Sequence, residues 1–122
     1  MTIKQTSPPL TASPEWQAVL VQTHGNVALA RQLFSILAEE LPGQCAEIEA
    51  QLQQRKWQAA GKIVHKLHGS SSFCGLTAVQ TICAELESVL RKEQPPDATL
   101  IARFRLETNQ LMQFLAQLAH CA

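Results

Sequence analysis

The sequence predicts an all-α protein, an antiparallel up-down-up-down four-helix bundle with a short N-terminal cap helix. Apolar residues recur at intervals of three and four through four long segments, which is the period of an amphipathic helix. Short breaks join the segments, as in helix bundles, and no stretch alternates apolar with polar residues as a strand would. The 122 residues, 46% of them apolar, are sufficient for one domain with its own core.

The expected domain covers residues 14–120, and residues 1–13 read as a flexible leader or linker because they contain prolines and little periodicity. Ser13 followed by Pro14 is typical of a helix N-cap with proline at the first helical position. We therefore expect a short helix from Pro14 to about residue 23.

The next segment is predicted to be one long, kinked helix from about residue 26 to 54. Gly25 suits the end of the preceding helix and Asn26 the cap of this one. Pro42 and Gly43 interrupt the pattern, and a proline inside a helix costs about 3 kcal/mol. The apolar phase nevertheless continues through the interruption, which favours one helix over the alternative of two.

Three further helices complete the predicted bundle. Each has an apolar stripe and ends in a polar break or at a glycine. Their expected bounds are about 57 to 73, about 76 or 77 to 92, and from after the Pro95-Pro96 break to about 120.

The segment 57–73 presents a histidine to solvent. Its apolar stripe is formed by Trp57, Ala60, Val64, Leu67 and Ser71. At about 100° per residue, His65 projects roughly 130° from the middle of this stripe and is expected to face water without a bulky neighbour. The same arithmetic places these residues beside it: Gly61, Lys62, Gly69 and Ser72, with His68 on the flank towards the core.

Such an exposed imidazole can accept a phosphoryl group, because a neutral ring nitrogen is a nucleophile. The phosphorylated ring favours a nearby cation and no carboxylate. Lys62 lies one turn earlier and Lys66 is adjacent, and no acid occurs between Glu49 and Glu85. Gly69 and Ser72 leave room for a partner's active site. The chain has neither a GxxxxGK[ST] nor a GxGxxG motif, so Mg²⁺ and the second reactive group are expected to come from the partner.

Three stretches resemble the histidine-containing phosphotransfer (HPt) domain: Val64-His-Lys-Leu-His-Gly-Ser70, Phe73-Cys-Gly-Leu76 and Cys83-Ala-Glu-Leu-Glu87. Within that family the chain is most similar to the C-terminal module of BarA/GacS-type hybrid sensor histidine kinases. The resemblance implies that His65 accepts phosphate from a receiver aspartate of a hybrid sensor kinase and passes it to the receiver of a response regulator. It implies a monomeric carrier in two-component signalling, without kinase activity of its own.

One departure from the family pattern concerns the cation near the phosphate. The family usually has lysine three residues after the phosphorylated histidine, where this chain has His68. Either Lys62 substitutes for that lysine, or His68 donates a hydrogen bond. A purely structural role of His68 is an equal alternative, and Phe73 and Gly61 are expected to join Gly69 in docking the partner.

The alternative function is a helical adaptor that docks receiver domains without carrying phosphate. A metal site is not expected, because the His65–His68 pair has only Cys74 as a nearby third ligand. Lysine plus arginine equals aspartate plus glutamate at 10 each, so binding of nucleic acid or of an anionic membrane is not expected.

A cytoplasmic location is expected from two absences in the sequence. No apolar run approaches the roughly 20 residues that span a bilayer, and the N-terminus lacks the apolar region of a signal peptide. The four cysteines are then expected to be thiols, as in a reducing compartment.

Overall fold

The computed structural model describes residues 13–120, so the expected leader lies outside the described residues except for Ser13. Within this range the chain forms five helices and no strand, as predicted. The helices are α1 (Pro14–Gln22), α2 (Val27–Gln53), α3 (Trp57–Phe73), α4 (Thr77–Arg91) and α5 (Ala98–His120).

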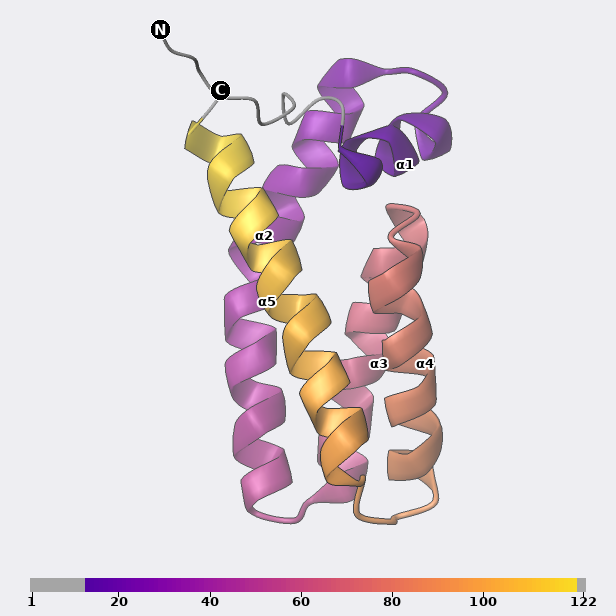
Figure 1. The fold of residues 1–122 in the computed structure, drawn as a ribbon, viewed down its shortest axis with the longest axis vertical. Coiled ribbons are helices and arrows are strands. Elements are labelled where there is room, and N and C mark those ends of the chain that lie inside the picture. The colour runs from indigo at the N-terminus through magenta and orange to yellow at the C-terminus, as the bar shows by residue number, and fades with distance from the viewer. Residues whose placement is uncertain (1–12, 121–122) are drawn as a thin grey trace, which may run out of the picture.

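The four long helices run alternately down and up the bundle (Figure 1). α2 packs on α3, α3 on α4, α4 on α5, and α5 closes the ring on α2. α1 packs on α2 at the end of the bundle where α3 turns into α4. The predicted four-helix bundle with an N-terminal cap helix is confirmed.

The expected capping residues delimit α1 and α2. Ser13 Oγ accepts a hydrogen bond from the Trp16 N–H at 3.1 Å, and Asn26 Oδ1 accepts one from the Leu29 N–H at 3.0 Å. Gly25 ends the turn between the two helices with a φ of 81°, a left-handed conformation that glycine adopts without strain.

Pro42 lies inside α2 without ending it. Its ring and Gly43 are exposed, whereas Leu41 and Ile48 on either side of the interruption are buried in the core. Burial of both turns of the apolar stripe offsets the lost hydrogen bond. Figure 1 shows α2 changing direction part-way along its length. The prediction of one long, kinked helix is confirmed.

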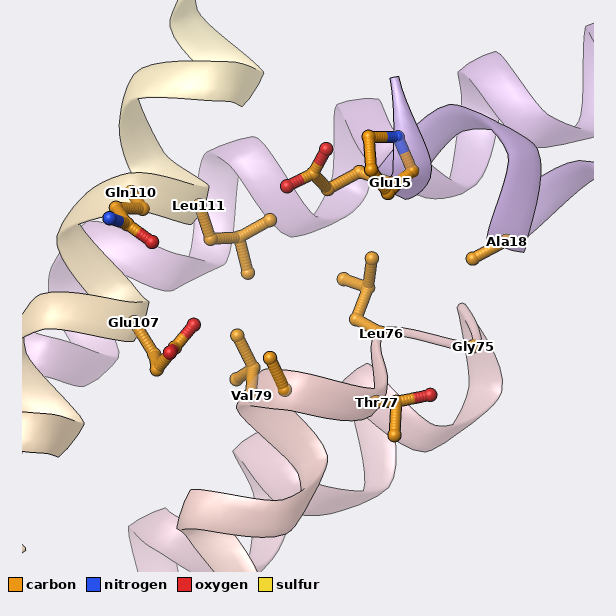
Figure 2. A pocket seen from close by; sticks show the side chains of 11 residues that line it. Glu15, Ala18, Gly75, Leu76, Thr77, Val79, Glu107, Gln110 and Leu111 are labelled. Atoms are coloured by element: carbon orange, nitrogen blue, oxygen red, sulfur yellow. The ribbon is translucent and has the colours of Figure 1, made fainter. Parts of the chain in front are cut away.

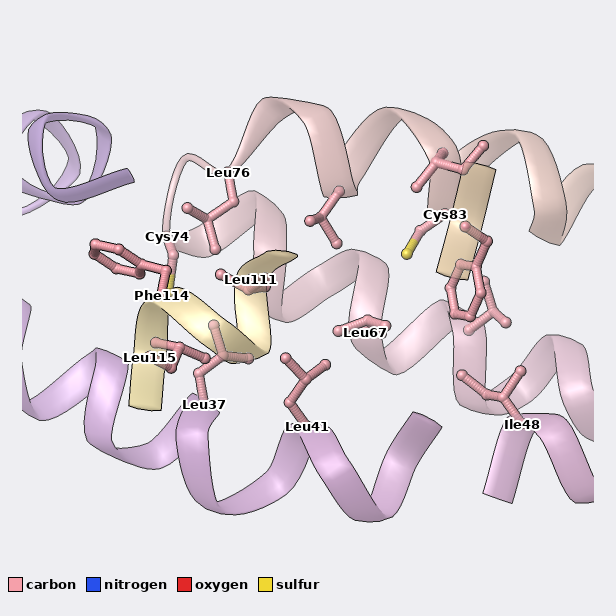
Figure 3. Packing of buried hydrophobic residues seen from close by; sticks show 14 of the residues in the cluster. Leu37, Leu41, Ile48, Leu67, Cys74, Leu76, Cys83, Leu111, Phe114 and Leu115 are labelled. Atoms are coloured by element: carbon pink, nitrogen blue, oxygen red, sulfur yellow. The ribbon is translucent and has the colours of Figure 1, made fainter. Parts of the chain in front are cut away.

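The core lies along the axis of the bundle and is built from the predicted stripes. Figure 3 shows Leu37 and Leu41 of α2 packing near Leu67 of α3 and Leu111 of α5. On α3 the buried residues are Ala60, Gly61, Val64, Leu67 and Ser71. This fixes the rotation of α3, so residues on the opposite side of that helix face away from the core.

The turn between α3 and α4 requires glycine. Gly75 has a φ of 73°, and a Cβ on it would lie 3.0 Å from Gln22 Cγ and 3.1 Å from the Ala18 carbonyl oxygen of α1. The positive φ explains why glycine is needed here, and the close contact shows how α1 covers this turn.

Candidate functional site

His65 lies on the outer surface of α3, as its position relative to the stripe predicted. Its side chain is 62% exposed. Lys62 and Lys66 are exposed on the same helix. The prediction that the ring faces water is confirmed.

The environment of His65 differs from the sequence-based expectation in one respect, because α4 brings a carboxylate to the ring. Glu87 Oε2 lies 2.8 Å from His65 Nδ1 and 2.7 Å from Arg91 Nη2. The side chain of Glu87 is only 9% exposed. The expectation that no carboxylate lies near the ring, drawn from the lack of acids within 50–84, was therefore wrong, since the acid comes from the neighbouring helix.

The hydrogen bond to Glu87 determines which ring nitrogen is available. An ionised carboxylate only accepts hydrogen bonds, so Nδ1 carries the hydrogen and donates it. In the uncharged ring, Nε2 then keeps its lone pair and is not engaged by any described residue. Because Glu87 is itself held by Arg91, the ring has a fixed tautomer and orientation.

A hollow of about 570 Å³ lies beside the His65 ring, between α3 and α4. It is lined by Gln58, Gly61, Lys62, His65, Lys66, Glu87, Leu90 and Arg91. Three of its side chains are cationic and one is anionic. The site can therefore accommodate an anionic group next to the free ring nitrogen.

Gly61 allows α3 and α4 to approach closely at this hollow. A Cβ on Gly61 would lie 3.3 Å from Leu90 Cβ, which is tight for two carbon atoms. Leu90 is fully buried and follows Glu87 by one turn of α4. Gly61, which was expected to help to dock the partner, is buried under α4 but lines the hollow beside His65. Its role in docking stays a prediction.

The family model for the Hpt domain matches residues 32–120. The chain belongs to the Hpt domain family. The activity of this family is phosphotransfer in two-component signalling, in which HPt domains work with receiver domains.

Curated relatives and a solved structure agree with this membership. Over 80 residues the chain is 32% identical to the signal transduction histidine-protein kinase BarA of Shigella flexneri and to that of Escherichia coli K12. The match covers 66% of this chain and 9% of each kinase, so the chain spans only a small part of these relatives. The crystal structure of the HPT domain of a sensor hybrid histidine kinase from Shewanella superposes with a TM-score of 0.79 at 27% identity, covering 88% of this chain and 93% of that one.

The remaining site residues predicted for this HPt domain lie along α3 away from the hollow. Gly69 is exposed and has open space where a Cβ would be. Phe73 at the end of α3 is 65% exposed. Ser72 donates to the His68 carbonyl oxygen at 2.8 Å, and the half-buried His68 ring makes no hydrogen bond within the described part of the chain.

Sequence reasoning did not identify Glu87 and Arg91 as site residues. A signal for Glu87 was present, since it follows Leu86 on the buried stripe of α4, where an acid needs a partner. The partner itself could not be found without the packing of α3 on α4.

A second cavity of the described structure offers no competing imidazole or thiol. A cavity of about 210 Å³ lies between α1, the α3–α4 turn and α5, where Glu15 and Glu107 flank the apolar residues Leu76 and Leu111 (Figure 2). It contains no imidazole or thiol and shares no lining residue with the His65 hollow.

Neither a metal centre nor a membrane span is found in the described chain. Residues 13–120 contain no group of three potential metal ligands and no helix long and apolar enough to cross a membrane. Cys45, Cys74 and Cys83 are free thiols, and Cys121 lies outside the described residues. Burial raises the pKa of Cys74 to about 11 and that of Cys83 to about 12, so both are poor nucleophiles.

Proposed function

We propose that this chain is a phosphorelay intermediate in which His65 is the phosphoacceptor. It takes the phosphoryl group from a receiver aspartate of a hybrid sensor kinase and passes it to the receiver of a response regulator. The observation that carries the proposal is the exposed His65 ring with Nδ1 bound to Glu87 and Nε2 free. We further infer that the domain is residues 14–120, works as a cytoplasmic monomer and has no kinase activity of its own.

The transfer step can be written from this geometry. The Nε2 lone pair attacks the phosphorus of the aspartyl phosphate, and the N–P bond forms as the bond from phosphorus to the acyl oxygen breaks. The aspartate leaves as a carboxylate. Since Nδ1 keeps its hydrogen, the ring gains positive charge as the bond forms, and the Glu87 carboxylate stabilises that charge. The reverse reaction delivers the group to the second receiver.

Cations around the hollow stabilise the transferred group. Lys62, Lys66 and Arg91 line the space beside the ring. They supply the positive charge that a lysine at the position of His68 usually gives in the family. Much of the catalysis in phosphoryl transfer is positioning and charge stabilisation, and the receiver is expected to bring the Mg²⁺.

The side of His65 towards the end of α3 leaves room for the receiver. Gly69 has no side chain to obstruct it, and the exposed ring of Phe73 offers an apolar contact. His68 and Ser72 lie between them, and we propose that they shape this surface rather than contact the phosphate.

The experiment compares wild type with His65→Gln, using a receiver phosphorylated in the presence of Mg²⁺. We expect the variant to take up no phosphate while its helicity and thermal midpoint stay close to wild type, because the ring is exposed. His68→Gln is the matched control and should still be labelled. If wild type binds the receiver but is never labelled, the adaptor function is correct instead.

A further inference from the structure

The charges of this neutral chain are unevenly distributed around the bundle. Cations gather on the surface formed by the α2–α3 turn, α3 and the end of α4, which we call the basic patch: Arg55, Lys56, Lys62, Lys66, Arg91 and Lys92. The acids on or beside this surface are Glu47, Glu87 and Glu93. The patch therefore carries an excess of positive charge.

Most cations of the basic patch have no anionic partner within residues 13–120. Arg91 is paired with Glu87, whereas Lys56, Lys62, Lys66 and Lys92 have no carboxylate at ion-pair distance. Arg55 stacks on an aromatic ring, with its guanidinium carbon 5.6 Å from the Trp57 centroid.

The two arginines of α5 behave differently. Each guanidinium of Arg103 and Arg105 makes two hydrogen bonds to a glutamate of another helix. On the basic patch, Glu93 Oε2 accepts a hydrogen bond from the side-chain amide of Gln58 at 3.2 Å rather than from a cation. Most of the charge of the basic patch is thus unpaired, while the charges of the two arginines of α5 are paired.

The basic patch is continuous with the His65 hollow. Gln58 and Lys62 line that hollow, and they also line a neighbouring shallow depression of about 610 Å³. The depression extends the surface to Arg55 and Lys56 at the start of α3. From His65 in the other direction, the residues 67–73 carry no lysine, arginine, aspartate or glutamate.

We propose that the basic patch docks an acidic protein surface that lies to one side of the phosphorylated aspartate of the receiver. This inference rests on the proposed phosphotransfer function and adds the chemistry of the partner. Because the charge lies on only one side of His65, it selects one orientation of the receiver, with its acidic side on the start of α3 and its apolar side near Phe73. Complementary charge of this kind raises the association rate and rejects wrong partners more than it adds affinity.

An acidic protein fits this patch better than a nucleic acid does. The chain as a whole has no net charge, and Glu47, Glu87 and Glu93 are interspersed with the cations. Such carboxylates repel a continuous phosphate backbone, whereas a folded partner can place its own groups around them.

The test measures transfer from a phosphorylated receiver to the full chain as a function of receiver and salt concentration. Lys56→Glu reverses one charge of the patch nine residues from His65. It should not disrupt folding, because an acidic residue is favourable at the start of a helix. Arg31→Glu is the matched control, since it makes the same charge change on the α2–α5 side of the bundle.

We expect Lys56→Glu to raise the half-saturating receiver concentration about threefold to tenfold at low salt, with the maximal rate unchanged. The difference should disappear at about 0.5 M salt, where the Debye length is only a few ångströms. Arg31→Glu should match wild type. Equal effects of both variants, or none from Lys56→Glu at any salt concentration, would overturn the docking surface.

Two further outcomes separate this inference from its alternatives. If a single-stranded RNA or anionic vesicles compete with the receiver at low micromolar concentration, the patch binds a phosphate polymer or a membrane and the acidic-protein partner is wrong. If wild type is labelled on His65 with no dependence on salt, only the docking inference fails. A wild type that is not labelled at all contradicts the phosphotransfer proposal itself.

Discussion

Replacing Glu87 with glutamine should slow phosphoryl transfer while leaving the bundle intact. The Glu87 carboxylate holds both His65 Nδ1 at 2.8 Å and Arg91 at 2.7 Å. Both contacts are made by Oε2, so a glutamine with its carbonyl oxygen in that place can still accept from Nδ1 and from Arg91. The amide is neutral, however, and no longer stabilises the positive charge that the ring gains during transfer.

The size of the effect follows from the charge that is lost. A hydrogen bond to a charged group contributes about 1.5–3 kcal/mol and a neutral one about 0.5–1.5 kcal/mol. The difference of about 1–1.5 kcal/mol corresponds to a roughly fivefold to tenfold lower rate. Little screening by water is expected, because the Glu87 side chain is only 9% exposed.

The assay is single-turnover transfer from a phosphorylated receiver, combined with ¹⁵N NMR of the His65 ring to identify the tautomer. Glu85→Gln is the matched control, because Glu85 lies on the same helix and pairs with Arg103 at the surface. It should change neither the rate nor the tautomer. A Glu87→Gln protein that transfers at the wild-type rate, or a Glu85→Gln protein that is equally slow, would refute the role of Glu87.

Three further outcomes are expected. Gly69→Ala should raise the free energy of unfolding by about 0.5–1 kcal/mol, since the added Cβ meets no other atom. Gly61→Ala should raise it less and should slow transfer, because its Cβ presses on Leu90 of α4. Equal gains for both variants in urea unfolding would contradict the close contact of α3 with α4. The Arg105 guanidinium lowers the pKa of Glu49, so their interaction stabilises the fold above pH 4.5 and is lost as the pH falls through the lowered value. Glu49→Gln should therefore cost about 0.5 kcal/mol at pH 7 and less at pH 3, and an equal cost at both would refute the linkage. With a pKa of about 12, Cys83 should react with a thiol reagent at pH 8 only as fast as the chain unfolds; labelling at the rate of free cysteine would show that the core is open.

The fold could be predicted because it depends on patterns within single helices. The spacing of Val64 and Leu67 on α3 determines which side of that helix is buried, and the capping of Asn26 depends on residues three positions away. Pro42, in contrast, is a local signal that indicates the end of a helix. Burial of the stripe on both sides of it outweighed the lost hydrogen bond.

The site was only half predictable, because half of it comes from α4. His65 and Lys62 share one helix, so helical arithmetic placed them together. Glu87 lies 22 residues from His65 and meets it only through the packing of α3 on α4. The burial of Gly61 has the same cause, since Leu90 covers it. The lack of acids in the sequence around His65 therefore did not predict the charges that surround its ring in the folded chain.

We propose that Glu87 fixes the His65 ring so that Nε2 is the phosphorylated atom. The most direct measurement is two-dimensional ¹H–¹⁵N NMR of the imidazole-labelled chain after phosphorylation by a receiver. We predict that the phosphoryl group is on Nε2 of His65. A phosphoryl group on Nδ1, or on any other residue, would contradict this role of Glu87.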